Sequence, residues 1–459
     1  MTALGEAARA GDTEAVRELL REGAEPDGVD EHGLPPLCAA VAAYAHEAAD
    51  LLVEAGADPD RVLPDGTTPL LRAVESGSPA VVSALLWSRD LPDPAERLAE
   101  AERARLLDAA RHWYRAGAEA ELRRRTGAAG PAATSTVEDE WCRVEEIALG
   151  GLTVRAGHGA VLTTLEALFG VPVPLEELVA RAVRHTESHV DWSAAGRRLE
   201  ARLAEGSREV VAALRHHPSP VHRRFAADWM VTVQWRLKAE EYPYDEEDRE
   251  LLAAWADVEP DPEVLAAVLW AITEQDVGHP RLESIGLRYA VHPDPRVRMR
   301  SVYCMGWSDG PFTAAERGAL ELLAGDPDDE VRFCAVLSLL ATGQDVDALR
   351  CVVRDLVRDP RSPVRQSAAD SMAESADRTA DATDLLLSLL DADEPLTRLI
   401  GAYGLALRDH PETPEAYARV EELGPFFSPD HRVNALWSWK ERNDPGRGAA
   451  GARYPDGTE

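Results

Sequence analysis

Of the 459 residues, 82 are acidic and 49 are basic, so the chain carries a net charge of −33. This charge repels a phosphate backbone, and we therefore do not expect nucleic acid as a partner. Hydrophobic residues make up 45% of the chain but aromatic residues only 6%. Ala, Leu and Val supply most of the apolar content, which suits close helix packing, and we predict an all-α fold.

The sequence carries no signal for a membrane or for secretion. No apolar run approaches the roughly 18 residues that span a bilayer, and no basic segment followed by an apolar one opens the chain. The five cysteines are odd in number and never spaced as CxxC, which predicts neither a disulfide framework nor a zinc ribbon. We expect a cytoplasmic protein without a cofactor.

A repeat with an offset of 33 residues opens the chain. "GAEPDGV" at 23–29 recurs as "GADPDRV" at 56–62. The same offset relates Ala3 to Pro36 and Pro69, Leu4 to Leu37 and Leu70, and Gly33 to Gly66. Three units are therefore in register.

These units resemble ankyrin repeats, in particular "LLVEAGADPD" (51–60) and "DGTTPLLRAV" (65–74). One departure concerns the His that usually follows Thr-Pro-Leu, because Gly5, Cys38 and Leu71 stand there and cannot tie neighbouring loops as that His does. The resemblance implies stacked helix pairs over residues 1–90 and a protein partner. It places the partner contacts at variable loop and helix positions: Glu31, His32, Leu34, Leu63, Pro64, Thr67, Arg72 and Glu75.

Residues 91–204 lack a clear period, and we predict a helical connector. "GAAGPAATST" (127–136) has the composition of a loop, and Ser135 with Glu138 forms the capping pattern of a following helix. "CRVEEIALGG" (142–151) is also read as helical.

The glycine-rich stretch 149–170 offers a candidate anion pocket. A glycine turn that opens a helix can cradle a phosphate, with Arg155, His158 and Thr163 as candidate contacts. The spacing fits neither a P-loop nor a dinucleotide fingerprint. A tight corner between two helices is the favoured interpretation.

"RHTESHVDW" (184–192) contains a candidate metal pair. On a helix His185 and His189 would point the same way, with Glu187 nearby. The HExxH pattern is absent and spacing fixes no third ligand. A solvated helix face is the favoured interpretation, and no metal is expected.

A second rhythm runs over residues 205–444, where a Pro/Asp turn precedes each helix. Val297, Val331, Val364 and Thr397 align at spacings of 34, 33 and 33, with weaker copies at Val221, Val264 and Val433. These seven units resemble HEAT repeats of the phycobilin-lyase type. The arginines that follow, Arg298, Arg332, Arg365 and Arg398, are predicted to bond neighbouring turns. Residues 445–459 are expected to form a disordered tail.

The fold predicted from these patterns is an α-solenoid: ankyrin repeats, a helical connector and HEAT-like repeats. The leading hypothesis is a non-catalytic scaffold or adaptor that binds a protein with a basic surface through the ankyrin loops and the concave HEAT surface. The alternative is an enzyme of lyase or hydrolase type, with its site around His158, His185 and His189.

Overall fold

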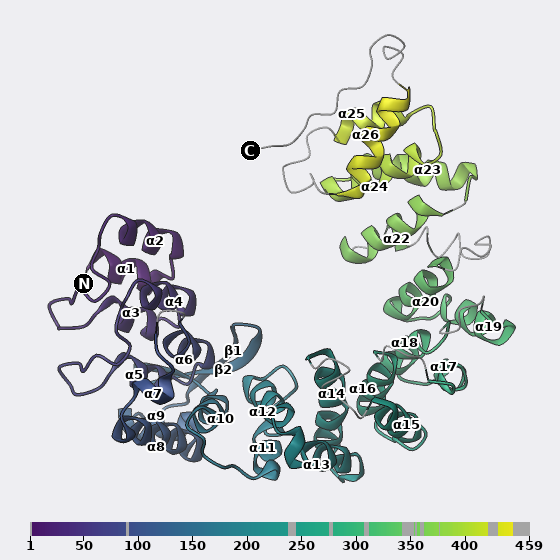
Figure 1. The fold of residues 1–459 in the computed structure, drawn as a ribbon. Helices are drawn as coiled ribbons and strands as arrows, with labels where there is room; N and C mark the ends of the chain where they lie inside the picture. The colour runs from purple at the N-terminus through teal and green to yellow at the C-terminus, as the bar shows by residue number, and fades with distance from the viewer. Residues whose placement is uncertain are drawn as a thin grey trace. The chain divides into compact units, whose positions relative to one another are not determined.

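A computed structural model describes residues 2–88, 91–236, 245–274, 279–306, 312–341, 353, 356–358, 362–375, 377–420 and 430–443. The chain divides into two compact units, Met1–Lys238 and Ala239–Glu459. The described residues are mostly helical, which confirms the predicted fold class (Figure 1). The predicted tail at 445–459 lies outside them, and none of the described helices is long and apolar enough to cross a membrane.

Three helix pairs form the start of the first unit. They are α1 (Ala3–Ala10) with α2 (Thr13–Arg21), α3 (Pro36–Ala42) with α4 (His46–Glu54), and α5 (Pro69–Ser76) with α6 (Pro79–Leu86). The first helix of each pair begins 33 residues after the first helix of the preceding pair, as the sequence offset predicts. Pro36 and Pro69 occupy the first helical position, where a missing N–H costs no hydrogen bond.

The hydrophobic core of these repeats continues into the next helices. Leu37, Leu70 and Leu85 share one buried cluster with Leu106 of α8 (Glu100–Ala116) and Leu165 of α10 (His158–Leu168). A terminal repeat exposes an apolar face that needs a cover. The helices α8 and α10 supply that cover, so residues beyond 90 complete the stack.

A three-stranded antiparallel sheet interrupts the helices of the first unit. Its order is β1 (Ala133–Asp139), β2 (Cys142–Leu149) and β3 (Leu152–Arg155). The predicted helix capped by Ser135 and Glu138 is therefore wrong, and so is the helical interpretation of 142–151. The turn signal is Gly150–Gly151, both with positive φ (61° and 83°), a pair that favours a two-residue hairpin over a helix.

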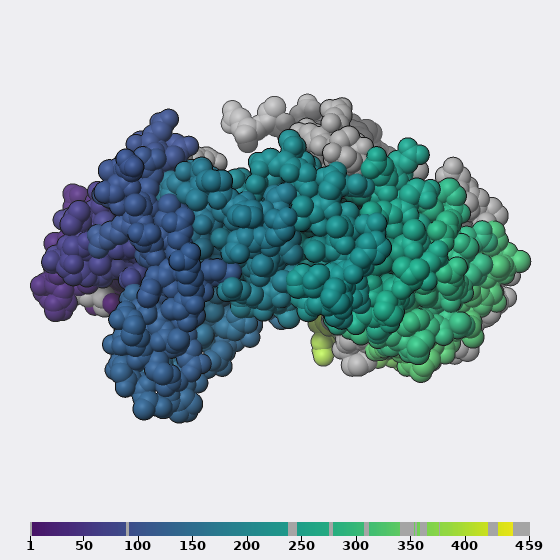
Figure 2. Space-filling view, turned by 90° about the horizontal axis from the view of Figure 1, so that it is seen from below, coloured from purple at the N-terminus to yellow at the C-terminus, as the bar shows by residue number. Residues whose placement is uncertain are grey.

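Further helices complete the first unit, whose surface runs from the purple ankyrin repeats to teal helices (Figure 2). They are α7 (Pro94–Arg97), α9 (Ala118–Thr126), α11 (Leu175–Ala182), α12 (Val190–Glu200), α13 (Ser207–Ala213) and α14 (Pro220–Arg236), with short 3-10 turns at Leu203–Glu205 and Leu214–His216.

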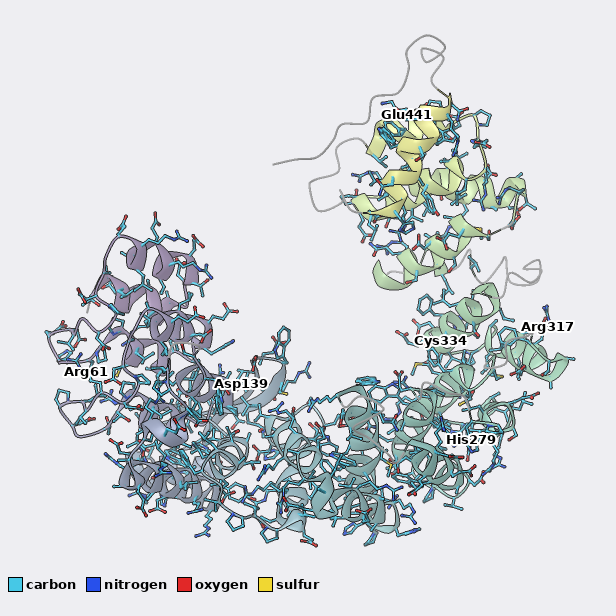
Figure 3. The ribbon with its side chains drawn as sticks, in the orientation of Figure 1. Arg61, Asp139, His279, Arg317, Cys334 and Glu441 are labelled. Atoms are coloured by element: carbon cyan, nitrogen blue, oxygen red, sulfur yellow. The ribbon has the colours of Figure 1, made fainter. Side chains whose placement is uncertain are left out.

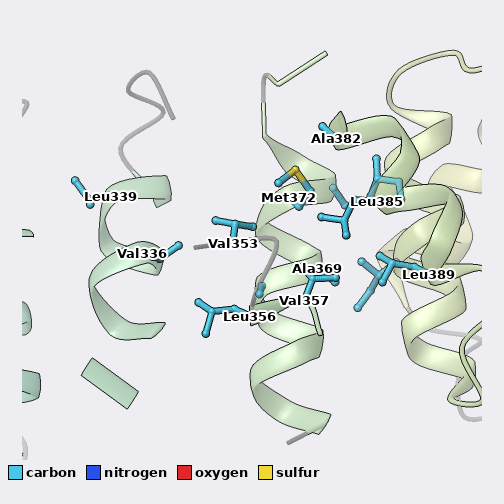
Figure 4. Close-up of a cluster of buried hydrophobic side chains, with 14 of the residues drawn as sticks. Val336, Leu339, Val353, Leu356, Val357, Ala369, Met372, Ala382, Leu385 and Leu389 are labelled. Atoms are coloured by element: carbon cyan, nitrogen blue, oxygen red, sulfur yellow. The ribbon is translucent and has the colours of Figure 1, made fainter. Parts of the chain in front are cut away.

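The second unit contains successive helices. They are α15 (Asp245–Ala256), α16 (Pro262–Thr273), α17 (Leu282–Tyr289), α18 (Pro295–Tyr303), α19 (Ala314–Leu323), α20 (Asp329–Ala341), α22 (Ser362–Glu374), α23 (Ala380–Leu389), α24 (Pro395–Ala406), α25 (Thr413–Val420) and α26 (His431–Asn443). One buried cluster runs from Ala290 to Leu436, and Figure 4 shows part of it, including Val336, Met372 and Leu385.

The aligned positions of the second rhythm share one place in their helices. Val264, Val297, Val331, Val364, Thr397 and Val433 are each the third residue of a helix. Three of the predicted arginines then bond the preceding turn in the same way. Nη1 of Arg298, Arg332 and Arg398 donates to the carbonyls six and five residues earlier, at 2.7–3.0 Å.

These contacts confirm a structural role for the arginines. Arg298 also pairs with Asp326 of the following turn at 2.7 Å, and the fourth predicted arginine, Arg365, pairs with Glu394 of its following turn.

In the first copy of the second rhythm, the predicted alignment is wrong by one residue. Arg223 donates Nη1 to the carbonyls of His217 and Pro218, in the pattern of Arg298. His222, not Val221, therefore stands where the other copies have valine. Val221, one residue before the aligned position, misled the sequence alignment.

Candidate functional site

The two long ankyrin loops are held in shape by aspartates. Asp30 Oδ1 accepts hydrogen bonds from the backbone N–H groups of His32 (2.9 Å) and Leu34 (3.0 Å). In the next loop Asp65 Oδ1 accepts from the N–H (2.9 Å) and the hydroxyl (2.6 Å) of Thr67. Each turn thus has a fixed backbone before any partner arrives.

The loops are also tied to their neighbours, although the usual His is absent. The Asp27 carboxylate accepts from the N–H of Asp58 at 3.2 Å, and Arg61 Nη1 donates to the Asp27 carbonyl at 3.1 Å. Asp60, at the position equivalent to Asp27, pairs with Arg97 of α7 at 3.0 Å. Burial raises the pKa of Asp60 to about 6, against the opposing effect of Arg97.

The predicted partner contacts differ in their access to solvent. Glu31, His32 and Pro64 are exposed, and Leu34 and Thr67 are half-buried. Leu63 is only 3% exposed because it packs inward from the loop, so we remove it from the candidate surface.

The two predicted contacts on α5 are held by partners within the chain. Arg72 is half-buried and pairs with Asp65 at 2.8 Å. Glu75 is also half-buried and pairs with Arg125 at 2.7 Å. A partner protein would have to compete with these internal ion pairs for Arg72 and Glu75.

A single buried carboxylate, Asp139, fastens the sheet to the third ankyrin repeat. Asp139 lies at the end of β1 (Figure 3) and is 3% exposed. It accepts from the Ser78 hydroxyl, from the Ala80 N–H at 2.9 Å and from Arg155. Gly77 has a φ of 73°, and a Cβ there would overlap the Arg155 carbonyl oxygen. Ser78 and Gly77, at the start of α6, therefore contact a strand that is distant in sequence.

The candidate anion contacts do not converge on one pocket. Arg155 is occupied by Asp139, and Thr163 donates to the Gly159 carbonyl at 2.8 Å and accepts from Arg181 at 3.0 Å. His158 is 2% exposed, stacks on Trp113 and donates from Nε2 to the Glu75 carbonyl at 3.2 Å. Burial lowers its pKa to about 4, so it is neutral at pH 7.

The stretch around these residues is also not the corner between helices that the sequence favours. It comprises a hairpin turn, a strand and the start of α10. The structure does not bring the three side chains into one anion pocket, because each has a different partner.

His185 and His189 lie together, but in the turn before α12 and not on a helix face. Their rings stack with centroids 3.6 Å apart, and His189 is only 3% exposed. Glu145 of β2 supplies the third group that spacing could not show, with Oε2 at 3.0 Å from His189 Nε2. One ligand atom from each of these three residues lies within 4.8 Å of the others.

The three side chains are of types that bind metals, but they are not arranged as the ligands of a metal site. His189 Nδ1 accepts from the Asp191 N–H at 3.1 Å, so the neutral ring carries its proton on Nε2, which faces Glu145. The two rings are parallel, whereas tetrahedral ligation needs converging lone pairs. Burial lowers the pKa of His189 to about 4 and raises that of Asp191 to about 7.

Below the tip of the β1–β2 hairpin lies a cleft of about 810 Å³. Its walls come from the hairpin, the turn at 187–188, α12 and α14. Residues on its floor include Trp192, Phe225 and Trp229, and its carboxylates are Glu138, Glu140, Glu187, Glu200 and Asp228. Nothing in the sequence spacing brings these elements together.

Residues 4–94 match the family model described as ankyrin repeats, in three copies. The N-terminal part of the chain therefore consists of ankyrin repeats, which generally serve as protein–protein interaction modules. A search of curated proteins finds no match. Among solved structures, the X-ray structure of YibA of Escherichia coli is 13% identical, with 58% of this chain and 93% of that chain covered. The TM-score between the two structures is 0.45.

Proposed function

We propose that this chain is a non-catalytic scaffold that binds another protein through its ankyrin loops. The observation that supports this function is the fixed, exposed pair of loops in the matched region. Glu31, His32 and Pro64 project from backbones that Asp30 and Asp65 hold in place. Binding there requires little ordering of the backbone, which lowers its entropic cost.

The partner in this proposal has a basic surface. Glu31, Asp30 and Asp65 add negative charge to loops of a chain whose net charge is −33. Such a field speeds and orients association with a basic protein and is screened by salt. We expect binding to weaken when the salt concentration rises to about 0.5 M.

The proposal also assigns residues 205–444 to a HEAT-like array whose concave face offers a second surface. The shared helix register and the repeated arginine bonds support this assignment. The division into 1–90, 91–204, 205–444 and 445–459 remains part of the proposal, beside the contact-based boundary at residues 238 and 239.

The test is affinity capture from the native cytoplasm with the wild type and two variants. The loop variant carries Glu31→Ala, His32→Ala and Pro64→Ala, all at exposed positions. The control is Asp108→Ala on α8, where the side chain is 81% exposed. A partner retained by the control and lost from the loop variant supports the proposal, and equal recovery with all three proteins contradicts it.

The convergence of Glu145, His185 and His189 favours one alternative, an enzyme of lyase or hydrolase type in the central segment. Its site would not include His158, which faces Glu75 and Trp113. Metal analysis of the purified chain tests it. A stoichiometric metal that is lost in the His185→Ala and His189→Ala variants would replace the scaffold by a metalloenzyme as the leading proposal.

A further inference from the structure

The cleft under the hairpin has walls that are joined by hydrogen bonds within the chain. On one side, the Arg143 N–H donates to the Ser188 carbonyl at 2.8 Å, and Asp139 anchors the hairpin to the ankyrin stack. On the other side, the Trp229 indole donates to the Gly196 carbonyl at 3.2 Å and joins α14 to α12. The cleft is therefore formed before a ligand binds.

Aromatic groups lie both on the floor and at the mouth. Trp192 packs edge-on against Phe225, with ring centroids 4.9 Å apart. At the hairpin tip Trp141 is 92% exposed, the largest exposure among the large hydrophobic side chains described. It follows Glu140, whose φ of 58° is one that glycine adopts more readily. This turn holds a large indole in water, where it contributes little to folding.

The cleft carries an excess of negative charge. Five carboxylates line it, against two guanidinium groups, Arg143 and Arg236. Glu200 and Asp228 lie deepest, and burial raises the pKa of both. Arg236 reaches Glu200 at 3.1 Å and the Trp192 indole donates to Asp228 at 2.7 Å. A cation that entered would relieve the cost of keeping these carboxylates out of water.

We propose that this cleft binds an arginine side chain on an extended segment of a partner protein. A guanidinium group stacks on an indole face and forms paired hydrogen bonds with a carboxylate, and this cleft offers both. The proposal rests on the proposed function, since it treats the chain as a protein-binding one, but it concerns a surface separate from the ankyrin loops. The hairpin that interrupts the helical stack then serves as one wall of a binding site.

The probe is a fluorescein-labelled peptide of alternating arginine and Gly-Ser units, and its control is the same peptide with citrulline in place of arginine. Binding to the full chain is measured by fluorescence anisotropy. The cleft variants are Trp141→Ala and the pair Glu138→Arg with Glu140→Arg, all at exposed positions. The controls are Trp87→Ala, at a tryptophan 52% exposed, and the charge reversal Asp108→Arg on α8.

We expect the arginine peptide to bind at least tenfold more tightly than the citrulline peptide. Trp141→Ala should weaken binding about threefold to tenfold, and the double charge reversal more than about tenfold. Trp87→Ala and Asp108→Arg should change it less than about twofold. Equal loss in the controls, or equal binding of the two peptides, would overturn the proposal, because bulk charge would then explain the result.

Capture with the same variants separates this inference from the proposed function. A partner that is lost from the ankyrin-loop variant but retained by both cleft variants overturns the cleft and leaves the scaffold function standing. A partner lost from the cleft variants and retained by the loop variant supports the cleft and contradicts the role of the ankyrin loops.

Discussion

The ankyrin repeats and the sheet at 133–155 are held in place in opposite ways. The Asp27 carboxylate ties the first two repeats by accepting from the Asp58 N–H, and Asp60, at the equivalent position, pairs with Arg97 of α7. The sheet meets the repeats at one buried carboxylate, Asp139, and at a hydrogen bond from the Tyr44 hydroxyl to the Thr153 carbonyl at 2.9 Å. Periodic contacts spread stability over many weak bonds, whereas a single buried charge concentrates it at one residue.

The largest expected effect is therefore at Asp139. The change Asp139→Ala removes the nearer carboxylate of Arg155, whose side chain is 11% exposed, and leaves it only Glu146 at 3.7 Å; it also removes the acceptor for Ser78 and Ala80. We expect a loss of about 3–5 kcal/mol in the free energy of unfolding of the first unit, measured by urea denaturation. Hydrogen exchange should show the loss first in β1 and at the start of α6.

The variant Asp139→Asn is the matched control, because the amide keeps an acceptor for the Ala80 N–H but lacks the charge. It should lie between wild type and Asp139→Ala. If both variants unfold like the wild type, the sheet is not held by this carboxylate and the contrast with the repeats disappears.

In the repeats a large effect requires loss of a core side chain. Leu70 is 1% exposed within the shared cluster, and Leu70→Ala should cost about 2–5 kcal/mol through lost burial and the cavity left behind. Val62, in the same repeat, is 70% exposed, so Val62→Ala should change stability by less than about 0.5 kcal/mol. Equal effects in thermal or urea unfolding would contradict the assignment of the core.

His158 makes the boundary between sheet and repeats sensitive to pH. Its folded pKa of about 4 lies below the unfolded value of 6.5, so only the unfolded chain takes up a proton as the pH falls through that window. Above pH 6.5 the neutral ring makes its full contribution to the free energy of unfolding. About 2 kcal/mol of it should be lost by pH 5.

The His158→Gln variant isolates this effect, because Asp191, with a raised pKa of about 7, changes stability in the opposite direction over the same range. The free energy of unfolding of the wild type should fall relative to that of the variant as the pH falls from 6.5 to 5. A difference that does not change with pH would mean that His158 is not buried as a neutral ring.

The difference between repeated and single contacts explains which parts of the fold the sequence could predict. The 33-residue offset places the ankyrin helices, and the Pro/Asp turns place the helices that follow them, with an error of one residue at His222. In both cases the signal is local and repeated. The sheet was missed because Glu145 and Glu146 interrupt the alternation of β2, although Gly150–Gly151 marked a hairpin.

The candidate sites were predicted less completely than the fold. His185 and His189 were found by spacing, but Glu145 reaches them only because β2 runs beside the turn at 188–189. The cleft likewise joins a hairpin, a turn and two helices that are distant in sequence. Such sites depend on tertiary contacts that no single period records.

The smallest expected effect concerns the repeated arginines of the second unit. Arg398 bonds two carbonyls of the preceding turn at 2.8 and 2.9 Å, and a lysine there would keep a positive charge but not the planar fork. Arg398→Lys should therefore cost about 1 kcal/mol in urea unfolding. Arg298→Lys, which also loses the two bonds to the buried Asp326, should cost more. If Arg398→Lys alone matched the effect of Asp139→Ala, the second array would depend on single residues as the sheet does, and periodicity would not explain the difference between the two regions.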